Sequence, residues 1–239
     1  GTNLDFSEGT PVDNGICTYA KDIESNGTTY SQMLEVTGWT IEGENGDARA
    51  AGLFAYGSGN WLGSKENIAP ATNPEGAAEG NALGVVAVWD AVAQYVQPVT
   101  LEAGNYVINI PVYNSVGGTT APAKSLIGFI ADNGTEYLAP AKAYAVNAWT
   151  VETITFTLTE TTTGKLSLGY DAPNSGSGAN QHLFFDKVEI MAVTETDLAR
   201  ADLDAVIATA QATVDAKAGV GAGLFMYSEE AYNTYAAAV

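Results

Sequence analysis

The residues of this 239-residue chain that could do chemistry are mainly carboxylates, amides and aromatic rings. They are densest in Tyr56-Gly-Ser-Gly-Asn60-Trp61, where a glycine-rich loop presents two rings and an amide. Aromatic rings stack on the C–H faces of sugars, and amides or carboxylates bond to sugar hydroxyls. The segment therefore indicates contact with a glycan through Tyr56, Asn60 and Trp61. The alternative for Tyr56 is a place in the core.

Three further pairs of polar and aromatic residues lie at the ends of predicted strands and could line one end of the same domain. They are Trp89 with Asp90, Tyr113 with Asn114, and Gln181 with His182. We include all six among the candidate ligand contacts. The competing interpretation is that the tryptophans Trp39, Trp89 and Trp149 belong to the hydrophobic core.

Recognisable catalytic machinery is missing from the sequence. His182 is the single histidine and Cys17 the single cysteine, so neither a nucleophilic triad nor a cysteine-based metal cluster can be assembled from familiar parts. Paired carboxylates could still hydrolyse glycosides, and the 28 Asp and Glu residues leave that reading open.

The elements that must position these residues are short β-strands. Apolar residues alternate with polar ones through Asn105–Asn114 and through Trp149–Thr159, which is the period of a strand with one buried face. A glycine-containing turn, LEAGNY, precedes the first of these segments, as in a hairpin. We expect ten strands: Asn3–Phe6, Gly38–Glu42, Ala50–Tyr56, Ala82–Trp89, Ala93–Val99, Asn105–Asn114, Ser125–Ala131, Trp149–Thr159, Lys165–Tyr170 and Leu183–Ala192. This pattern predicts a mainly β chain, an antiparallel jelly-roll-type β-sandwich over residues 1–193.

The hydrophobic period changes after Val193. Apolar residues recur at helical spacing from Leu198 to Val214, and three glycines from Gly219 to Gly223 end the pattern before a second cap at Ser228. We therefore expect residues 194–239 to form a short α-helical appendage, the truncated start of a helical bundle or a segment that docks on the sandwich.

Composition narrows the class of partner. A hydrophobic fraction of 46% suffices for a real core, and the net charge is −19. A surface of that sign repels nucleic acid and anionic lipid, and no 18-residue apolar run could span a membrane. Low lysine content and long polar turns are typical of exported bacterial modules, so we expect a secreted, periplasmic or cell-surface protein. The chain opens at Gly1 directly in a strand-like segment, which favours a trimmed piece of a larger polypeptide.

Five sequence pieces resemble the galactose-binding-domain-like β-sandwich family, which includes many carbohydrate-binding modules. They are NLDFSEG at the start, VTGWT, the central QYVQPVTLEAGNYVINIPVYN, and WTVETITFTL with LFFDKVEI near the end. The resemblance implies a non-catalytic module with a structural Ca²⁺ near the opening and closing strands. Its matching positions are Glu8 and Asp186, with Asn3 as a possible backbone ligand. Ser7 stands where the family often has Glu directly after the Phe, so the carboxylate is displaced by one position.

The residues around Asp186 predict its environment independently of the resemblance. Alternation places it on the face of Phe184, Val188 and Ile190, so we expect it to be buried. A buried carboxylate must be hydrogen-bonded, paired or bound to a metal ion. Calcium is one possibility, and loop N–H groups are the other.

The sequence thus favours a non-catalytic carbohydrate-binding-like module that contacts a polysaccharide through its loops and neighbours other domains of a larger chain. The alternative is a structural or adhesive spacer without glycan affinity. A glycosidase-like enzyme ranks third.

Overall fold

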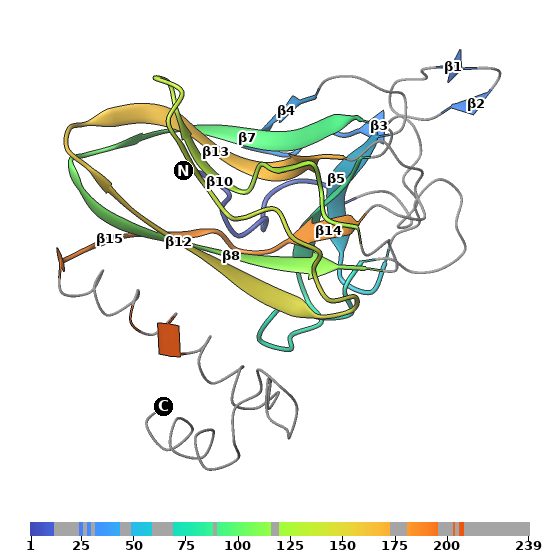
Figure 1. Ribbon diagram of the computed structural model, residues 1–239. Helices are drawn as coiled ribbons and strands as arrows, with labels where there is room; N and C mark the ends of the chain where they lie inside the picture. The colour runs from blue at the N-terminus through green and yellow to red at the C-terminus, as the bar shows by residue number, and fades with distance from the viewer. Residues whose placement is uncertain are drawn as a thin grey trace, which may run out of the picture. The chain divides into compact units, whose positions relative to one another are not determined.

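Alternating apolar residues build two β-sheets that face each other across one core (Figure 1). The computed structural model describes residues 1–11, 24–25, 28–29, 32–43, 49–58, 69–87, 90–115, 120–172, 181–195, 203 and 206–207. The chain divides into two units, Gly1–Ala192 and Val193–Val239. Nearly all of the predicted helical segment lies outside the described residues, so it stays a prediction. Among the described residues, no helix is long and apolar enough to cross a membrane.

The first sheet has six strands. Its path runs β11-β10-β13-β7-β4, and β9 adds to β13. The bounds are β4 Thr40–Glu42, β7 Val92–Leu101, β9 Lys124–Ser125, β10 Gly128–Ala131, β11 Glu136–Leu138 and β13 Thr162–Asp171. The long pair β7 and β13 forms the centre, in antiparallel register from Val92↔Asp171 to Leu101↔Thr162.

The second sheet has seven strands along β12-β8-β14-β6-β5-β3, and β15 adds to β8. The bounds are β3 Gln32–Met33, β5 Arg49–Ala55, β6 Asn81–Ala87, β8 Gly104–Asn114, β12 Trp149–Leu158, β14 His182–Phe185 and β15 Glu189–Val193. Strand β8 pairs antiparallel with β12 and β14, β6 pairs antiparallel with β14 and β5, and β3 pairs in parallel with β5. A separate two-stranded sheet joins β1 (Glu24–Ser25) to β2 (Thr28–Thr29).

The inner faces of the two large sheets share one hydrophobic core, as the alternation predicts. A run of stacked rings crosses it: Phe156 lies 4.4 Å from Tyr137 and 5.7 Å from Phe129, between ring centroids. Phe156 comes from the second sheet and the other two rings from the first. The predicted mainly β, antiparallel two-sheet sandwich is confirmed.

Three of the predicted strands differ in the structure. Asn3–Phe6 is a turn, with positive φ angles of 49° at Asn3 and 53° at Phe6, so the strand prediction there is wrong. Its alternation arises because Phe6 and Leu4 both turn toward the core, where Phe6 is fully buried and Leu4 partly buried. The segments predicted as Ser125–Ala131 and Leu183–Ala192 each break into two strands, β9 with β10 and β14 with β15.

Candidate functional site

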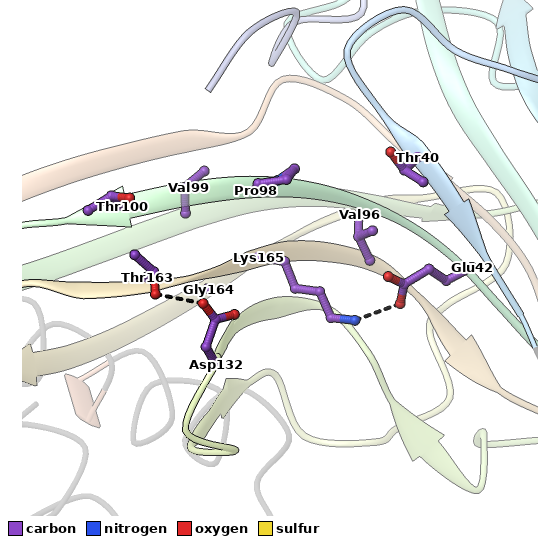
Figure 2. Close-up of a pocket in the computed structure, with 10 residues that line it drawn as sticks. All are labelled: Thr40, Glu42, Val96, Pro98, Val99, Thr100, Asp132, Thr163, Gly164 and Lys165. Atoms are coloured by element: carbon purple, nitrogen blue, oxygen red, sulfur yellow. Dashed lines mark hydrogen bonds and ion pairs between the residues drawn. The ribbon is translucent and has the colours of Figure 1, made fainter.

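An open groove crosses the outer face of the six-stranded sheet, over β4, β7 and β13 (Figure 2). It encloses about 480 Å³. Its walls are two carboxylates, an ammonium, three threonines and a short apolar patch; the lining residues are Thr40, Glu42, Val96, Pro98, Val99, Thr100, Asp132, Thr163, Gly164 and Lys165. Charged and hydroxyl groups beside an apolar strip are what a pocket for a polar organic ligand needs.

The strand register explains why these side chains meet. Pro98 of β7 pairs with Lys165 of β13, and on the other side of β7 Gln94 pairs with Glu42 of β4. On β13, Leu166 and Leu168 belong to the core, so Lys165 and Ser167 lie on the opposite face. The floor of the groove is therefore the solvent side of the three neighbouring strands.

Two polar contacts fix the charged walls. Lys165 Nζ lies 2.6 Å from Glu42 Oε2, which also accepts a hydrogen bond of 3.1 Å from Gln94 Nε2. The Thr163 hydroxyl donates to Asp132 Oδ2 at 2.6 Å. Figure 2 shows the Glu42–Lys165 pair and the Thr163–Asp132 pair side by side on the sheet. Each charged side chain of the groove is thus held in place by a neighbour.

The residues singled out from the sequence lie elsewhere. Asn60, Trp61 and Trp89 are outside the described residues. Asp90 is exposed in a turn, with a positive φ of 57°. Tyr113 is half-buried on the outer face of the seven-stranded sheet, with its ring centroid 5.3 Å from that of Trp149. These placements do not bring the described candidates together with the groove.

Tyr56 is tied to a small second hydrophobic cluster and to Asp186. It packs against the cluster that contains Phe54 and Phe184, on the face of the second sheet away from the main core. Its hydroxyl bonds to the Asp186 carboxylate, and burial, followed by the charge of Asp186, raises the pKa of Tyr56 well above its usual value. Burial also raises the pKa of Asp186. The hydrogen bonds from the Lys187 backbone and from Tyr56 lower this pKa, but by less than burial raises it. Asp186 is 6% exposed, so the expected burial is found. The alternation behind that expectation is wrong, because Asp186 lies between β14 and β15, and Phe184 packs in the second cluster while Val188 packs in the main core.

Asn114, Gln181 and His182 do meet at one end of the sandwich, but inside the protein. Asn114 and Gln181 are buried, and so is most of His182. The Gln181 amide accepts a hydrogen bond from Tyr144 N at 2.6 Å and donates to the Lys142 carbonyl at 2.9 Å. Asn114 Nδ2 donates to the Tyr144 carbonyl. These amides therefore anchor residues 139–148, which we call the strap, to the ends of β8 and β14.

Glu152 is a buried charge that the sequence reading missed. It falls at the inward position of β12 and is 5% exposed, and its carboxylate lies 2.5 Å from Lys142 Nζ of the strap. Lys142 also lies 5.2 Å above the ring of Tyr144. The polar position in an otherwise apolar alternation, Glu152 ahead of Ile154 and Phe156, was a signal available in the sequence.

The predicted calcium ligands meet only in part. The opening turn touches the final strands through Val188 N–H, which donates to the Leu4 carbonyl. The Asn3 carbonyl, however, accepts from Trp39 Nε1 at 3.1 Å, and the Asn3 side chain bonds to the backbone of Glu8 and Thr37. Glu8 is exposed and Asp186 bonds to Tyr56. Among the described residues, no group of three or more His, Cys, Asp or Glu could hold a metal ion. The contacts that Asn3 and Asp186 already make disfavour calcium at the predicted position.

Comparison with known proteins gives matches in structure alone. No protein-family model matches the chain, and neither does any curated protein sequence. The chain is similar to TmCBM61 in complex with β-1,4-galactotriose, at 16% identity and a TM-score of 0.39, over 66% of this chain and 90% of that one. It is similar to the family 11 carbohydrate-binding module of Clostridium thermocellum in complex with a β-1,3-1,4-mixed-linked tetrasaccharide, at 12% identity and a TM-score of 0.37, over 67% and 92%.

A third similar structure is the CBM22-1 xylan-binding domain of Paenibacillus barcinonensis Xyn10C, at 14% identity and a TM-score of 0.36, over 66% of this chain and 87% of that domain. All three are carbohydrate-binding modules. Since each TM-score is below 0.5, the two-sheet fold of this chain is established by its own strand pairing.

Proposed function

We propose that the unit Gly1–Ala192 is a non-catalytic carbohydrate-binding module whose groove over β4, β7 and β13 receives a glycan. The observation that carries this proposal is the groove itself, with its two carboxylates, ammonium and threonine hydroxyls beside Val96 and Pro98. Sugar hydroxyls donate to carboxylates and accept from ammonium and hydroxyl groups, while sugar C–H faces pack on apolar side chains. The groove offers both kinds of contact within one surface.

Binding without chemistry is the better reading of these carboxylates. Glycoside hydrolysis needs one carboxyl group to protonate the leaving oxygen and a second to attack or to activate water. Here Glu42 is bonded to Lys165 and Gln94, and Asp132 is bonded to Thr163. Each carboxylate is oriented by hydrogen-bond donors of the protein, so it is placed to accept hydrogen bonds rather than to protonate or attack a substrate. We further propose that the module meets its polysaccharide outside the cell, as one domain of a longer chain.

The groove is tested by titrating neutral oligosaccharides against the full chain, followed by tryptophan fluorescence and calorimetry. The panel includes β-1,4-galactotriose, mixed-linked β-1,3-1,4-glucan tetrasaccharide and xylotetraose. Saturable binding that weakens about tenfold in Asp132→Ala supports the groove, since a hydrogen bond to a charged group contributes about 1.5–3 kcal/mol.

The matched control is Asp5→Ala. Asp5 is an exposed carboxylate that accepts a hydrogen bond from the Ser7 hydroxyl at 2.8 Å, much as Asp132 accepts one from Thr163. Asp5 is not among the lining residues of the groove. Loss of affinity in both variants alike contradicts the groove as the site, flat titrations across the panel favour a spacer, and release of sugar from a chromogenic glycoside would show an enzyme.

The loop around Tyr56, Asn60 and Trp61 remains our second proposed contact, from its composition alone. Trp61→Ala separates it from the groove: if the loop contributes a stacking ring, affinity falls in this variant while Asp132→Ala and Trp61→Ala have separate, additive effects.

A further inference from the structure

Among the described residues that line the groove, Lys165 carries the one ammonium, and its charge is already paired. Lys165 Nζ lies 2.6 Å from Glu42 Oε2, and both side chains are partly exposed, at 32% for Lys165 and 40% for Glu42. The remaining charged group of the lining is Asp132, a second carboxylate. An entering ligand therefore meets an excess of negative charge, with the positive charge held by the protein itself.

The Glu42 carboxylate is held from behind by a buried relay. Ser167 Oγ donates to Gln94 Oε1 at 2.6 Å, and Gln94 Nε2 donates to Glu42 Oε2 at 3.1 Å. Ser167 is fully buried and Gln94 is 9% exposed. Because the Glu42 carboxylate only accepts hydrogen bonds, the Gln94 amide nitrogen points toward Glu42, and the amide oxygen is left to accept from the Ser167 hydroxyl. Two buried polar side chains, Gln94 and Ser167, thus hold the Glu42 carboxylate beside Lys165.

We propose that Glu42 determines the charge of the glycan that the groove accepts, and that Gln94 and Ser167 are its positioning residues. The proposal rests on the function proposed above and names the substrate class as neutral glycans, with uronic-acid glycans excluded. A free lysine in a binding groove attracts carboxylates strongly through charge-assisted hydrogen bonds. With Glu42 in place, a uronate must compete for Lys165 and also lies near two like charges.

The test compares each neutral probe of the panel that carries a primary hydroxyl with the same oligosaccharide oxidised at C6 to the uronate. Titrations use the full chain at about 0.15 M salt, where the Debye length of about 8 Å screens the distant charges of the protein. Wild type should bind the neutral form and bind the oxidised form weakly. Glu42→Gln keeps the shape and an acceptor oxygen but frees Lys165, so affinity for the oxidised form should rise about tenfold.

The matched control is Glu136→Gln. Glu136 pairs with Lys124 at 2.6 Å on the same sheet and with similar exposure, but neither residue lines the groove. This variant removes the same charge from the chain and should leave the preference for neutral glycans unchanged. An equal gain in both variants would assign the effect to net charge and overturn the role of Glu42.

The outcomes separate the two proposals. If wild type binds a neutral glycan and its oxidised form equally, or if Glu42→Gln gains nothing, the charge filter is wrong and the binding module stands. If wild type binds no member of the panel, the proposed function fails and the filter with it.

The relay is tested through the ratio of the two affinities rather than through either affinity alone. Ser167→Ala removes the hydroxyl that bonds to Gln94 and leaves Gln94 and Glu42 in place. It should shift this ratio toward the oxidised glycan by less than Glu42→Gln does. Gln94→Leu should shift it further than Ser167→Ala. If Ser167→Ala keeps the melting temperature of the wild type and leaves the ratio of the two affinities unchanged, Ser167 does not position Glu42.

Discussion

His182, one of the candidate ligand contacts, is mostly buried, and this burial has a consequence for stability. Burial lowers the pKa of His182 to about 4, from an ordinary value of 6.5. In the window between these values the unfolded chain binds the proton and the folded protein does not, so the free energy of unfolding falls as the pH drops from 6.5 to 4. The full effect is about 3 kcal/mol at pH 4 and below.

His182→Gln should remove this pH dependence while destabilising the protein at pH 7. The measurement is urea unfolding of both proteins at several pH values between 7 and 4. Asp186, whose pKa is raised, acts in the opposite direction, because its charged form is disfavoured in the folded state. It is present in both proteins, so the difference between them isolates His182. Parallel pH curves would show that His182 is not the titrating group.

The groove residues show what a sequence can and cannot predict at this scale. The alternation of Leu166 and Leu168 indicates that Lys165 faces outward. Its partner Glu42 lies 123 positions earlier, on a strand that reaches Lys165 only because β7 separates β4 from β13 in the sheet. Strand order is not encoded in local periodicity, and a site that depends on it escapes a reading by motifs.

Among the elements, the strap of residues 139–148 is tied near its two ends by backbone hydrogen bonds, from Ala139 N to the Ile127 carbonyl and from Asn147 N to the Asn114 carbonyl. Its middle is held by side chains. Gln181 alone bonds to both Tyr144 N and the Lys142 carbonyl, from a site that is 2% exposed. Gln181 also donates to the Thr120 carbonyl, so Gln181→Leu should leave three backbone groups without their present partner and destabilise the protein by about 2–4 kcal/mol. Hydrogen exchange should show faster exchange of the Tyr144 amide, with little change in the β8–β12 ladder.

Asn133→Ala serves as the control for that experiment. Asn133 Oδ1 accepts a single hydrogen bond from Thr135 N in an exposed turn, so its loss should cost under about 1 kcal/mol. Uniform exchange throughout the protein after Gln181→Leu would mean that the strap does not open as a unit.

The opening turn and the final strands are the elements to which the family resemblance assigns calcium. In the structure, Asn3 spends its polar atoms on Trp39, Thr37 and Glu8, and Asp186 bonds to Tyr56. We therefore expect the same melting temperature in chelator as in excess calcium at matched ionic strength. A ligand bound by the folded state alone at 100 times its Kd would add about 2.7 kcal/mol, so a rise of that size would show that these residues rearrange around an ion.

Elements with strong alternation were predictable, and those ended by irregular backbone were not. β8 and β12 lie within a residue of their predicted bounds because a slip in register would expose a whole apolar face. Asn3–Phe6 has a similar pattern of residue types but turns at two positive φ angles, and nothing in four residues distinguishes the two.

At the scale of the whole molecule, charge is the dominant property, and it acts on stability as well as on ligand choice. With 28 acidic and nine basic side chains, the folded surface repels itself more than the expanded unfolded chain does. Raising NaCl from about 10 mM to 150 mM shortens the Debye length from about 30 Å to 8 Å. If screening adds about 1 kcal/mol, the melting temperature should rise by about 2–4 °C. KCl should give the same rise at the same ionic strength, whereas a fall would mean that the ion pairs outweigh the self-repulsion.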